Sequence, residues 1–252
     1  MSAGAMPPRV DVVIGGAQKA GTTALDKALR AHPAMRMPSM KEPHFFDNDV
    51  LFANGVPDFD TYHAMWREGL GTRLCCDSTP SYLWWPSAPQ RLRDYNHALR
   101  WVILLRDPAE RAYSHWNMVR NNGFEALPFA DALDAEVSRL AAGLRRDRFR
   151  HSYVSRGFYA RQLARLFTLF PRDQVLVLRS DQLRKDFAAT VATVVEFLGL
   201  EPFETIEPIT AHQGNYAAPL APEQRAALVR RFDEDIRELE SLLGWELSDW
   251  RR

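Results

Sequence analysis

The sequence predicts an α/β protein with three layers, in which helices cover both faces of a central parallel sheet (an αβα arrangement). Two observations predict this fold. Short apolar runs rich in β-branched residues alternate along the chain with longer segments whose apolar residues recur at helical spacing. The first apolar run also leads directly into a glycine-containing loop and then a helix. Strands that alternate with helices form parallel sheets, and this opening is typical of a P-loop-like fold.

The elements follow in order along the chain. The predicted strands are residues 10–15, 72–76, 100–105 and 174–178, each a short apolar run. The predicted helices are residues 22–31, 107–119, 128–144, 155–170, 181–198 and 222–243, with Pro or Gly near several of their ends. Residues 35–62 are rich in Pro, Asp and Phe and are predicted to form a long loop. Loops of that length inside one domain are usually functional.

The composition is that of a globular protein. Of 252 residues, 46% are hydrophobic and 25% charged, which excludes disorder across the whole chain. We expect one domain over residues 1–252, with residues 1–9 as a flexible N-terminus. The 32 basic and 32 acidic residues cancel, so no global field attracts nucleic acid or an anionic membrane. An anion site has to be built locally.

The cysteines and apolar segments bear on the compartment. Cys75 and Cys76 are adjacent, and a disulfide between neighbours in a strand would be badly strained. No zinc-binding pattern, signal-peptide core or run of about 18 apolar residues is present in the sequence. We therefore expect a cytoplasmic protein with no membrane span and no metal.

The glycine loop predicts an anion site. Gly16 to Gly21, followed by Thr22 and Thr23, has the spacing of a Walker-type loop, whose backbone N–H groups and helix N-terminus bind an oxyanion. A Walker loop places Lys directly after the second Gly, whereas this chain has Lys19 within the loop. Lys19 can still reach a terminal group and neutralise charge on a bridging oxygen. The alternative is a tight turn between strand and helix with an exposed lysine.

A second candidate site follows the strand at 100–105. Arg106 lies at the carboxyl end of that strand, where ligands bind in open α/β folds, and Ser114 lies in the helix that follows. An arginine fork and a hydroxyl suit a phosphate. The alternative is pairing of Arg106 with Asp107 and a capped helix, without a ligand.

A third candidate site lies in the long loop, at Lys41-Glu42-Pro43-His44-Phe45-Phe46-Asp47. If Phe45 and Phe46 bury the segment, burial would raise the pKa of the Glu42 carboxyl toward a value useful for a general base. The alternative is a loop that the two aromatic residues anchor, with solvated charges around them.

These three segments resemble the PAPS-dependent sulfotransferase family, and within it the heparan-sulfate branch and its bacterial relatives. Residues 16–25 resemble the P-loop-like loop for the 5′-phosphosulfate, Arg106 to Ser114 the 3′-phosphate motif, and Lys41 to Asp47 the loop with the catalytic carboxylate. Two more segments match in order and spacing: Asp77-Ser78-Thr79-Pro80-Ser81-Tyr82, and Ser155-Arg156-Gly157-Phe158-Tyr159, which corresponds to the segment near the adenine.

The resemblance implies a sulfotransferase that transfers a sulfuryl group from PAPS to a hydroxyl or amine, by in-line displacement and without a metal, and releases PAP. The acceptor is expected to be a carbohydrate or a small natural product. The implied catalytic residues are Glu42 as general base, Lys19 and His44. The implied donor-binding residues are Gln18, Lys19, Ala20, Gly21, Thr22, Thr23, Arg106, Ser114, Tyr159 and Asn215. We expect Lys41, Tyr82, Trp84 and Trp85 to contact the acceptor, with packing as the alternative for the two tryptophans.

Two positions depart from the heparan-sulfate branch. That branch has a lysine at the position of Ser78, and we expect Lys41 to supply the missing charge. Its basic glycine loop aligns with residues 213–215, which hold no cation, although Asn215 can still donate. The alternatives are a lower affinity for the donor or compensation by Arg111 or another arginine. The branch's disulfide is absent too, which fits a cytoplasmic bacterial relative.

Two other classes of function stay open on the sequence alone. One is a P-loop kinase or NTPase that uses ATP and magnesium, with Asp77 at a strand end as a metal ligand. The other is a non-catalytic nucleotide-binding module, which would keep the glycine loop but would not need Glu42. The basic run at residues 145–150 is interpreted as a solvated helix end, with an anionic acceptor as the alternative.

Overall fold

A computed structural model of the chain describes residues 9–66, 73–207, 209, 216 and 218–252. The chain forms two compact units. The first consists of Met1–Ala17, Gly21–Leu104 and Leu166–Ile209, and the second of Gln18–Ala20, Leu105–Arg165 and Thr210–Arg252. Neither unit is one continuous stretch of sequence. A single domain over residues 1–252 stays a prediction, and residues 1–8 of the expected flexible N-terminus lie outside the described residues.

The first unit contains the sheet. Its strands follow the order β2-β3-β1-β4-β5, five strands within the described residues. The strands pair in parallel, with Val12 of β1 opposite Cys76 of β3 and Arg100 of β4. The three-layer αβα fold predicted from the sequence is confirmed. The elements are β1 (Val12–Gly16), α1 (Thr22–Arg30), β2 (Met35–Arg36), α2 (Phe59–His63), β3 (Leu74–Asp77), α3 (Ala88–Tyr95), β4 (Arg100–Leu105, whose last residue belongs to the second unit), η2 (Arg172–Gln174), β5 (Val175–Arg179), α8 (Ser180–Lys185) and α9 (Phe187–Phe197).

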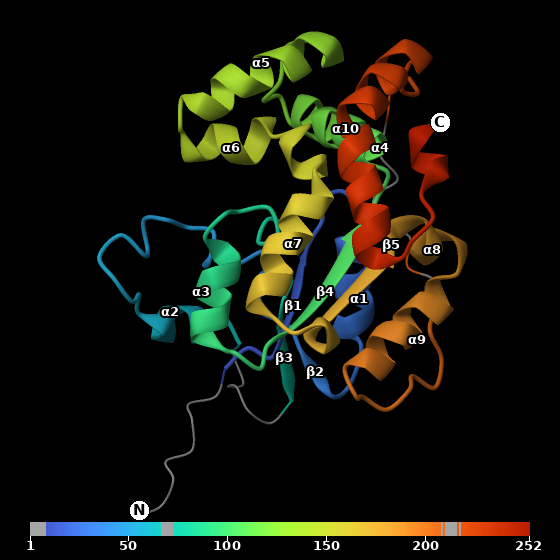
Figure 1. Ribbon diagram of the computed structural model, residues 1–252. Coiled ribbons are helices and arrows are strands. Elements are labelled where there is room, and N and C mark those ends of the chain that lie inside the picture. Colours follow the sequence, from blue (N-terminus) through green and yellow to red (C-terminus); the bar gives the residue numbers. More distant parts are fainter. Residues whose placement is uncertain (1–8, 67–72, 208, 210–215, 217) are drawn as a thin grey trace, which may run out of the picture. The chain divides into compact units, whose positions relative to one another are not determined.

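The core of this unit lies on both faces of the central strands. Figure 1 shows α1 behind the strands and the C-terminal part of α7 (Tyr159–Leu169) in front of them. On the front face, the fully buried Trp101 of β4 meets the ring of Phe170 at 5.7 Å. A Cβ on Gly15 would lie 2.3 Å from the Trp101 ring. Glycine at this position therefore lets the tryptophan pack directly against the β1 backbone.

The second unit is helical. In chain order it contains α4 (Pro108–Asn121), α5 (Phe129–Ala141), α6 (Arg145–His151), η1 (Ser155–Gly157), the first seven residues of α7, α10 (Pro222–Leu243) and η3 (Ser248–Arg251). Asp107 begins α4 by accepting hydrogen bonds from the backbone N–H groups of Ala109 and Glu110, with Pro108 in the first turn. Gly244 ends α10 in a left-handed conformation, as is common at helix C-termini.

Most predicted elements agree with the structure within a few residues. The strand at 100–105 and the helix at 222–243 have the predicted bounds. The predicted helix at 181–198 is two helices, because the Asp186 side chain caps a new helix by accepting a hydrogen bond from the N–H of Ala189. The predicted helix at 128–144 ends at Ala141, and α6 follows it as a separate helix.

The sequence analysis missed several short elements, among them β2, α2, α3 and the 3-10 helices η2 and η3. Strand β2 has two residues, too few to show a pattern, and pairs with β3 through Met35 and Leu74. Helices α2 and α3 were also missed, although the buried Ala88, Leu92 and Tyr95 have helical spacing in α3. No helix among the described residues is long and apolar enough to cross a membrane.

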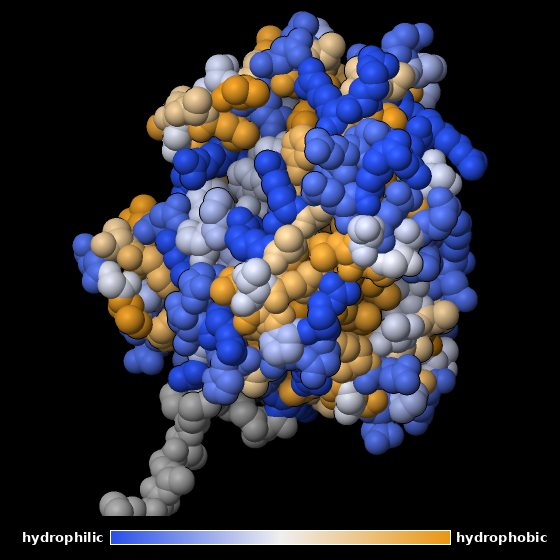
Figure 2. Space-filling view, in the orientation of Figure 1, coloured by the Kyte–Doolittle hydropathy of each residue, from blue (hydrophilic) through white to orange (hydrophobic). Residues whose placement is uncertain are grey.

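The loop between β2 and α2 carries exposed apolar side chains. Val50, Leu51 and Val56 are 75%, 42% and 86% exposed. Figure 2 shows hydrophobic atoms at the surface of this loop, at the left of the view. The first unit does not bury these side chains itself, which leaves them available to a bound molecule.

Candidate active site

The glycine loop connects β1 to the N-terminus of α1. Gly21 precedes the helix with a φ of 99°, and a Cβ there would lie 3.1 Å from Leu183, so this position favours glycine. Thr22 is buried and Thr23 half-buried in the first turn of α1. No side chain caps this helix, which leaves backbone N–H groups of its first turn without an intrahelical partner. Such a helix start is suited to an oxyanion.

Lys19 lies in this loop in an uncommon backbone conformation. Across the described residues, the non-glycine residues with positive φ are Lys19 (72°), Glu42 (60°) and His44 (52°). Left-handed conformations are unfavourable for residues with a side chain and concentrate at functional sites. The three residues predicted to be catalytic therefore share a feature that the sequence does not display.

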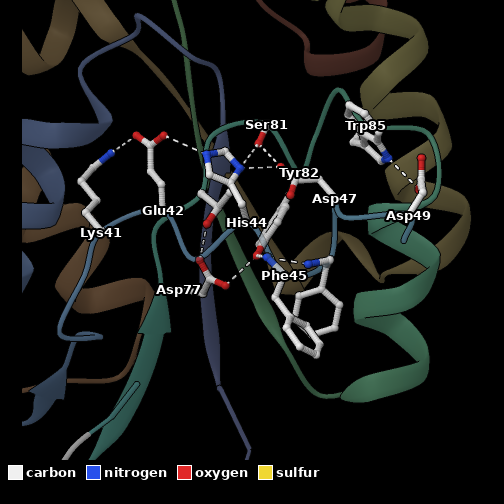
Figure 3. A network of polar contacts seen from close by, with 12 residues as sticks. Lys41, Glu42, His44, Phe45, Asp47, Asp49, Asp77, Ser81, Tyr82 and Trp85 are labelled. Carbon is white, nitrogen blue, oxygen red and sulfur yellow. Dashed lines mark hydrogen bonds and ion pairs between the residues drawn. The ribbon is translucent and has the colours of Figure 1, made fainter. Parts of the chain in front are cut away.

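The Lys41–Asp47 segment forms a row of alternating charges in the first unit. Lys41 contacts one oxygen of Glu42, and His44 Nε2 lies 3.5 Å from the other. His44 Nδ1 lies 2.8 Å from Oδ2 of the fully buried Asp47, which also accepts a hydrogen bond from Ser81. Figure 3 shows these side chains in one row from Lys41 to Asp47. Each charge in the row faces one of opposite sign.

The expected rise of the Glu42 pKa is wrong. Burial raises this pKa, but the hydrogen bond from His44 and the charge and hydrogen bond of Lys41 outweigh burial and lower it to about 2. Burial lowers the pKa of His44, but the carboxylates of Asp47 and Glu42 outweigh it and raise this pKa to about 9. At neutral pH the segment therefore holds a Glu42 carboxylate against a His44 imidazolium.

The residues predicted to bind the 3′-phosphate lie in the second unit. Arg106 donates to the backbone oxygen of Lys19 at 3.3 Å and lies 3.4 Å from Glu110. The hydroxyl of Ser114 on α4 accepts a hydrogen bond of 2.8 Å from Tyr216. Tyr159 is buried, and its hydroxyl donates to the backbone oxygen of Arg106 at 2.9 Å. Residues 213–215, including Asn215, lie outside the described residues.

This part of the second unit contains buried positive charge. Arg111 is fully buried, donates through Nη2 to Tyr153, and has no hydrogen-bond partner for Nε and Nη1 within the described chain. The pKa of His115 lies well below its ordinary value because of burial and the nearby charges of Arg111, Arg156 and Lys19. A buried cation with unused N–H groups is costly unless an anion compensates it.

The residues predicted to contact the acceptor differ in accessibility. Tyr82 is fully buried, and its hydroxyl contacts Asp77 and backbone N–H groups of the loop at 45–46. Trp85 is buried, and its Nε1 donates to Asp49 at 3.1 Å. Trp84 is half-buried and Lys41 points toward Glu42 (Figure 3). Of these four, Lys41 and Trp84 remain able to touch a bound molecule.

The sequence analysis assigned no role to three polar neighbours of the candidate residues: Asp47 and Ser81 in the row of the first unit, and Tyr216 beside Ser114 in the second unit. Asp47 lies three residues after His44, and this spacing could have identified it as a partner of the histidine. Ser81 lies in the matching segment Asp77 to Tyr82, but only the fold brings its hydroxyl to Asp47. Tyr216 had no sequence signal, because only the fold brings it to Ser114. The described residues contain no group of three or more His, Cys, Asp or Glu side chains arranged to hold a metal.

Comparisons with known proteins find sulfotransferases. The family model described as "Sulfotransferase domain" matches residues 9–213. Heparan sulfate glucosamine 3-O-sulfotransferase 5 of Mus musculus is 27% identical over 199 residues, which are 75% of this chain and 53% of that protein. Heparan sulfate glucosamine 3-O-sulfotransferase 3B1 of Homo sapiens is 30% identical over 194 residues, 75% of this chain and 46% of that protein. The chain thus spans about half the length of these relatives.

Solved structures match over nearly the whole chain. The crystal structure of a sulfotransferase from Alicyclobacillus acidocaldarius is 28% identical, with a TM-score of 0.84 over 97% of this chain and 99% of that one. A mouse sulfotransferase complexed with PAP is 14% identical, with a TM-score of 0.54 over 92% of this chain and 85% of that one, and shows the shared fold.

Proposed function

We propose that this chain, which belongs to the sulfotransferase domain family, transfers a sulfuryl group from PAPS to a hydroxyl or amine, with Glu42 as general base. The resemblance to the heparan-sulfate branch and its bacterial relatives is confirmed. One observation carries the proposal: the Glu42 carboxylate lies 3.5 Å from His44, which the buried Asp47 holds from its other side. This arrangement fixes an ionised carboxylate in one orientation.

The family uses PAPS as donor and releases PAP. When bound, PAPS would supply the sulfuryl group and a leaving phosphate. We assign its 5′ end to Lys19, Gly21, Thr22 and Thr23, together with the neighbouring Gln18 and Ala20. The buried Arg111 lies close to the charge of Arg106 and has unused N–H groups, and Arg111 and Lys19 both act on the buried His115. This concentration of positive charge in the second unit supports a polyanionic donor. Lys19 and the loop N–H groups would stabilise charge that develops on the leaving oxygen.

We assign the donor's 3′-phosphate to Arg106 and Ser114, with Tyr216 orienting the serine hydroxyl toward it. Tyr216 donates to Ser114 at 2.8 Å, and its ring lies 5.7 Å from that of Tyr113. Its hydroxyl is therefore held at the serine we assign to the phosphate. Arg111 and Tyr216 together would compensate for the cation missing at residues 213–215. Tyr159 would act through the backbone of Arg106, and Asn215 remains a proposed ligand outside the described residues.

Glu42 would accept the proton of the acceptor as the bond to sulfur forms. Its low pKa keeps it ionised across the physiological range, so it is always able to accept a proton, although only as a weak base. A weak base is sufficient where the proton moves late, when the acceptor oxygen has become acidic. His44 would hold the carboxylate, and Lys41 would supply the charge missing at Ser78.

We propose a carbohydrate hydroxyl as the first acceptor to test, with a small natural product as the second. The curated relatives are named for the 3-O position of a glucosamine in heparan sulfate. The half-buried Trp84 and the exposed apolar loop at 50–56 offer apolar surface to a sugar ring in the first unit.

The test is transfer of radioactive sulfur from PAPS to a panel of desulfated heparan oligosaccharides, other sugars, phenols and amines. We expect a labelled carbohydrate product whose formation needs Glu42 and continues in the presence of a chelator. Transfer of phosphate from ATP that the chelator abolishes would instead support the kinase alternative. PAP binding without transfer to any acceptor would support the non-catalytic module.

The kinase alternative has to assign a metal to Asp77. This carboxylate is fully buried, and hydroxyls of the first unit occupy both of its oxygens: Thr79 donates to Oδ1, and Tyr62 and Tyr82 donate to Oδ2. A metal would have to displace these donors. The structure therefore favours another role for Asp77.

A further inference from the structure

Asp77, at the end of β3, is the centre of a buried polar network in the first unit. Tyr62 of α2 donates to Oδ2 at 2.7 Å, Tyr82 donates to the same oxygen at 2.9 Å, and Thr79 donates to Oδ1 at 2.6 Å. All four residues are fully buried. A buried carboxylate needs donors of this kind, and here it also fixes the direction of two tyrosine hydroxyls.

Tyr82 extends this network to the loop that carries the charged row. Its hydroxyl accepts the backbone N–H of Phe45 at 3.2 Å and that of Phe46 at 3.4 Å. A tyrosine hydroxyl has one proton to donate and two lone pairs. Because Asp77 takes the proton, both lone pairs are left for the two loop N–H groups. Figure 3 shows Tyr82 between Asp77 and Phe45.

The loop needs such a support because of its backbone. Glu42 and His44 both have positive φ, on either side of Pro43, and conformations of this kind persist only where the surroundings impose them. The N–H groups of Phe45 and Phe46 directly follow His44. A shift of this backbone would move His44 away from Glu42 and Asp47.

We propose that Tyr82 is a positioning residue for proton transfer: its hydroxyl, oriented by Asp77, fixes the backbone at 45–46 and thereby holds His44 against Glu42. This inference rests on the proposed role of Glu42 as general base. Tyr82 acts through the backbone of the loop. This role takes the place of the direct contact with the acceptor that the sequence predicted.

Tyr62 provides a matched control. It donates to the same oxygen of Asp77 and is equally buried, and its ring packs on Phe45 at 4.5 Å. Within the described part of the chain, its hydroxyl bonds to Asp77 and makes no hydrogen bond to the loop backbone. Tyr62→Phe and Tyr82→Phe therefore each remove one hydrogen bond to Oδ2 of Asp77. Only Tyr82→Phe also removes the acceptor of two loop N–H groups.

The test compares sulfuryl transfer by the full-length wild type, Tyr62→Phe and Tyr82→Phe. We expect Tyr82→Phe to lower kcat by about 10- to 100-fold, because a small displacement of catalytic groups has an effect of that order. Its KM for PAPS should stay within about 2-fold of the wild type, because the substitution is not expected to change donor binding. Tyr62→Phe should stay within about 3-fold in kcat. Equal losses in the two variants would overturn the proposal.

A second readout is independent of activity. The pKa of the His44 imidazole, about 9 in the intact row, is measured by NMR titration, with His44→Gln to assign the signal. We expect it to fall toward 6.5 in Tyr82→Phe and to stay unchanged in Tyr62→Phe. If the pKa of His44 in Tyr82→Phe equals that in the wild type, the proposal is overturned, even if the chain transfers no sulfuryl group. Absence of transfer by the wild type would overturn only the proposed function.

If Tyr82→Phe does not fold, amide hydrogen exchange of the wild type decides. The N–H groups of Phe45 and Phe46 should be protected far more strongly than those of the exposed loop at 53–56, because Tyr82 accepts both. Exchange as fast as in that exposed loop would overturn the proposal.

Discussion

The two regions assigned to chemistry differ in how their charges are balanced. In the first unit, Lys41, Glu42, His44 and Asp47 alternate in sign, and each contacts a neighbour of opposite charge. In the second unit, Arg111 is buried with two nitrogens unused within the described chain, and both oxygens of nearby Glu136 accept backbone N–H groups. The first region pairs each of its charges without a ligand, whereas the second leaves N–H groups of the buried Arg111 unused within the described chain. On the roles proposed above, the groups for proton transfer would be in place before the donor binds, while the donor would supply the missing counter-charge.

Removal of the base should have the largest effect. We expect Glu42→Gln to lower kcat by about 10²- to 10⁴-fold, the usual range for general-base catalysis, because the amide cannot accept the proton. The affinity for PAP, measured by calorimetry, should be unchanged, since our assignment places the donor elsewhere. The matched control is Asp58→Asn, an exposed helix cap in the same unit that asparagine can replace. Equal rates for Glu42→Gln and the wild type would remove Glu42 from the mechanism.

The second region should respond in donor affinity. We expect Arg106→Ala to weaken PAP binding by about 10- to 100-fold, since a hydrogen bond to a charged group contributes about 1.5–3 kcal/mol. Calorimetric titration with PAP measures this loss. Arg237→Ala serves as control, because Arg237 on α10 is exposed and pairs only at the surface with Asp233. Unchanged affinity in Arg106→Ala would contradict the assignment of the 3′-phosphate.

The sequence predicted four of the five described strands and the glycine loop, because these are visible as local patterns. The fully buried run of β1 and the apolar run of β4 were visible as uninterrupted apolar residues, and the glycine loop as spacing. What it missed were short elements, such as β2, whose existence depends on pairing with β3. A strand of two residues has no periodicity to detect.

For the candidate site, the sequence identified residue types but not their environment. It predicted a raised pKa for Glu42 from the neighbouring aromatics, and the structure gives the opposite direction because His44 and Lys41 outweigh burial. It placed Tyr82 at the acceptor, whereas the fold buries it against Asp77. Both outcomes depend on which side chains face one another across a loop, and residue order does not encode this directly.

A smaller effect would sharpen the picture of the second region. We expect Tyr216→Phe to weaken PAP binding by about 3- to 10-fold, because a neutral hydrogen bond contributes roughly 0.5–1.5 kcal/mol. Affinity for adenosine 5′-monophosphate, which lacks the 3′-phosphate, should stay unchanged. Equal weakening for both nucleotides would show that Tyr216 acts on the structure of the unit and not on the 3′-phosphate.

The smallest effect concerns the charge of His44 in the first region, and it appears as a pH dependence of the free energy of unfolding. The pKa of His44 is raised to about 9, above its ordinary value of 6.5, so the imidazolium contributes stability that is fully present below pH 6.5 and is lost as the pH rises through 9. The stability difference between wild type and His44→Gln should therefore shrink over this window, by about 0.5–1 kcal/mol, since the side chains of His44 and Glu42 are 34% and 36% exposed and solvent screens their attraction. Urea unfolding at pH 6, 7.5 and 9.5 measures this difference, with the exposed His97→Gln as control. A difference that stays constant across these pH values would mean that His44 is neutral in the folded protein, and the row would then lack the alternation of charge that distinguishes it from the second region.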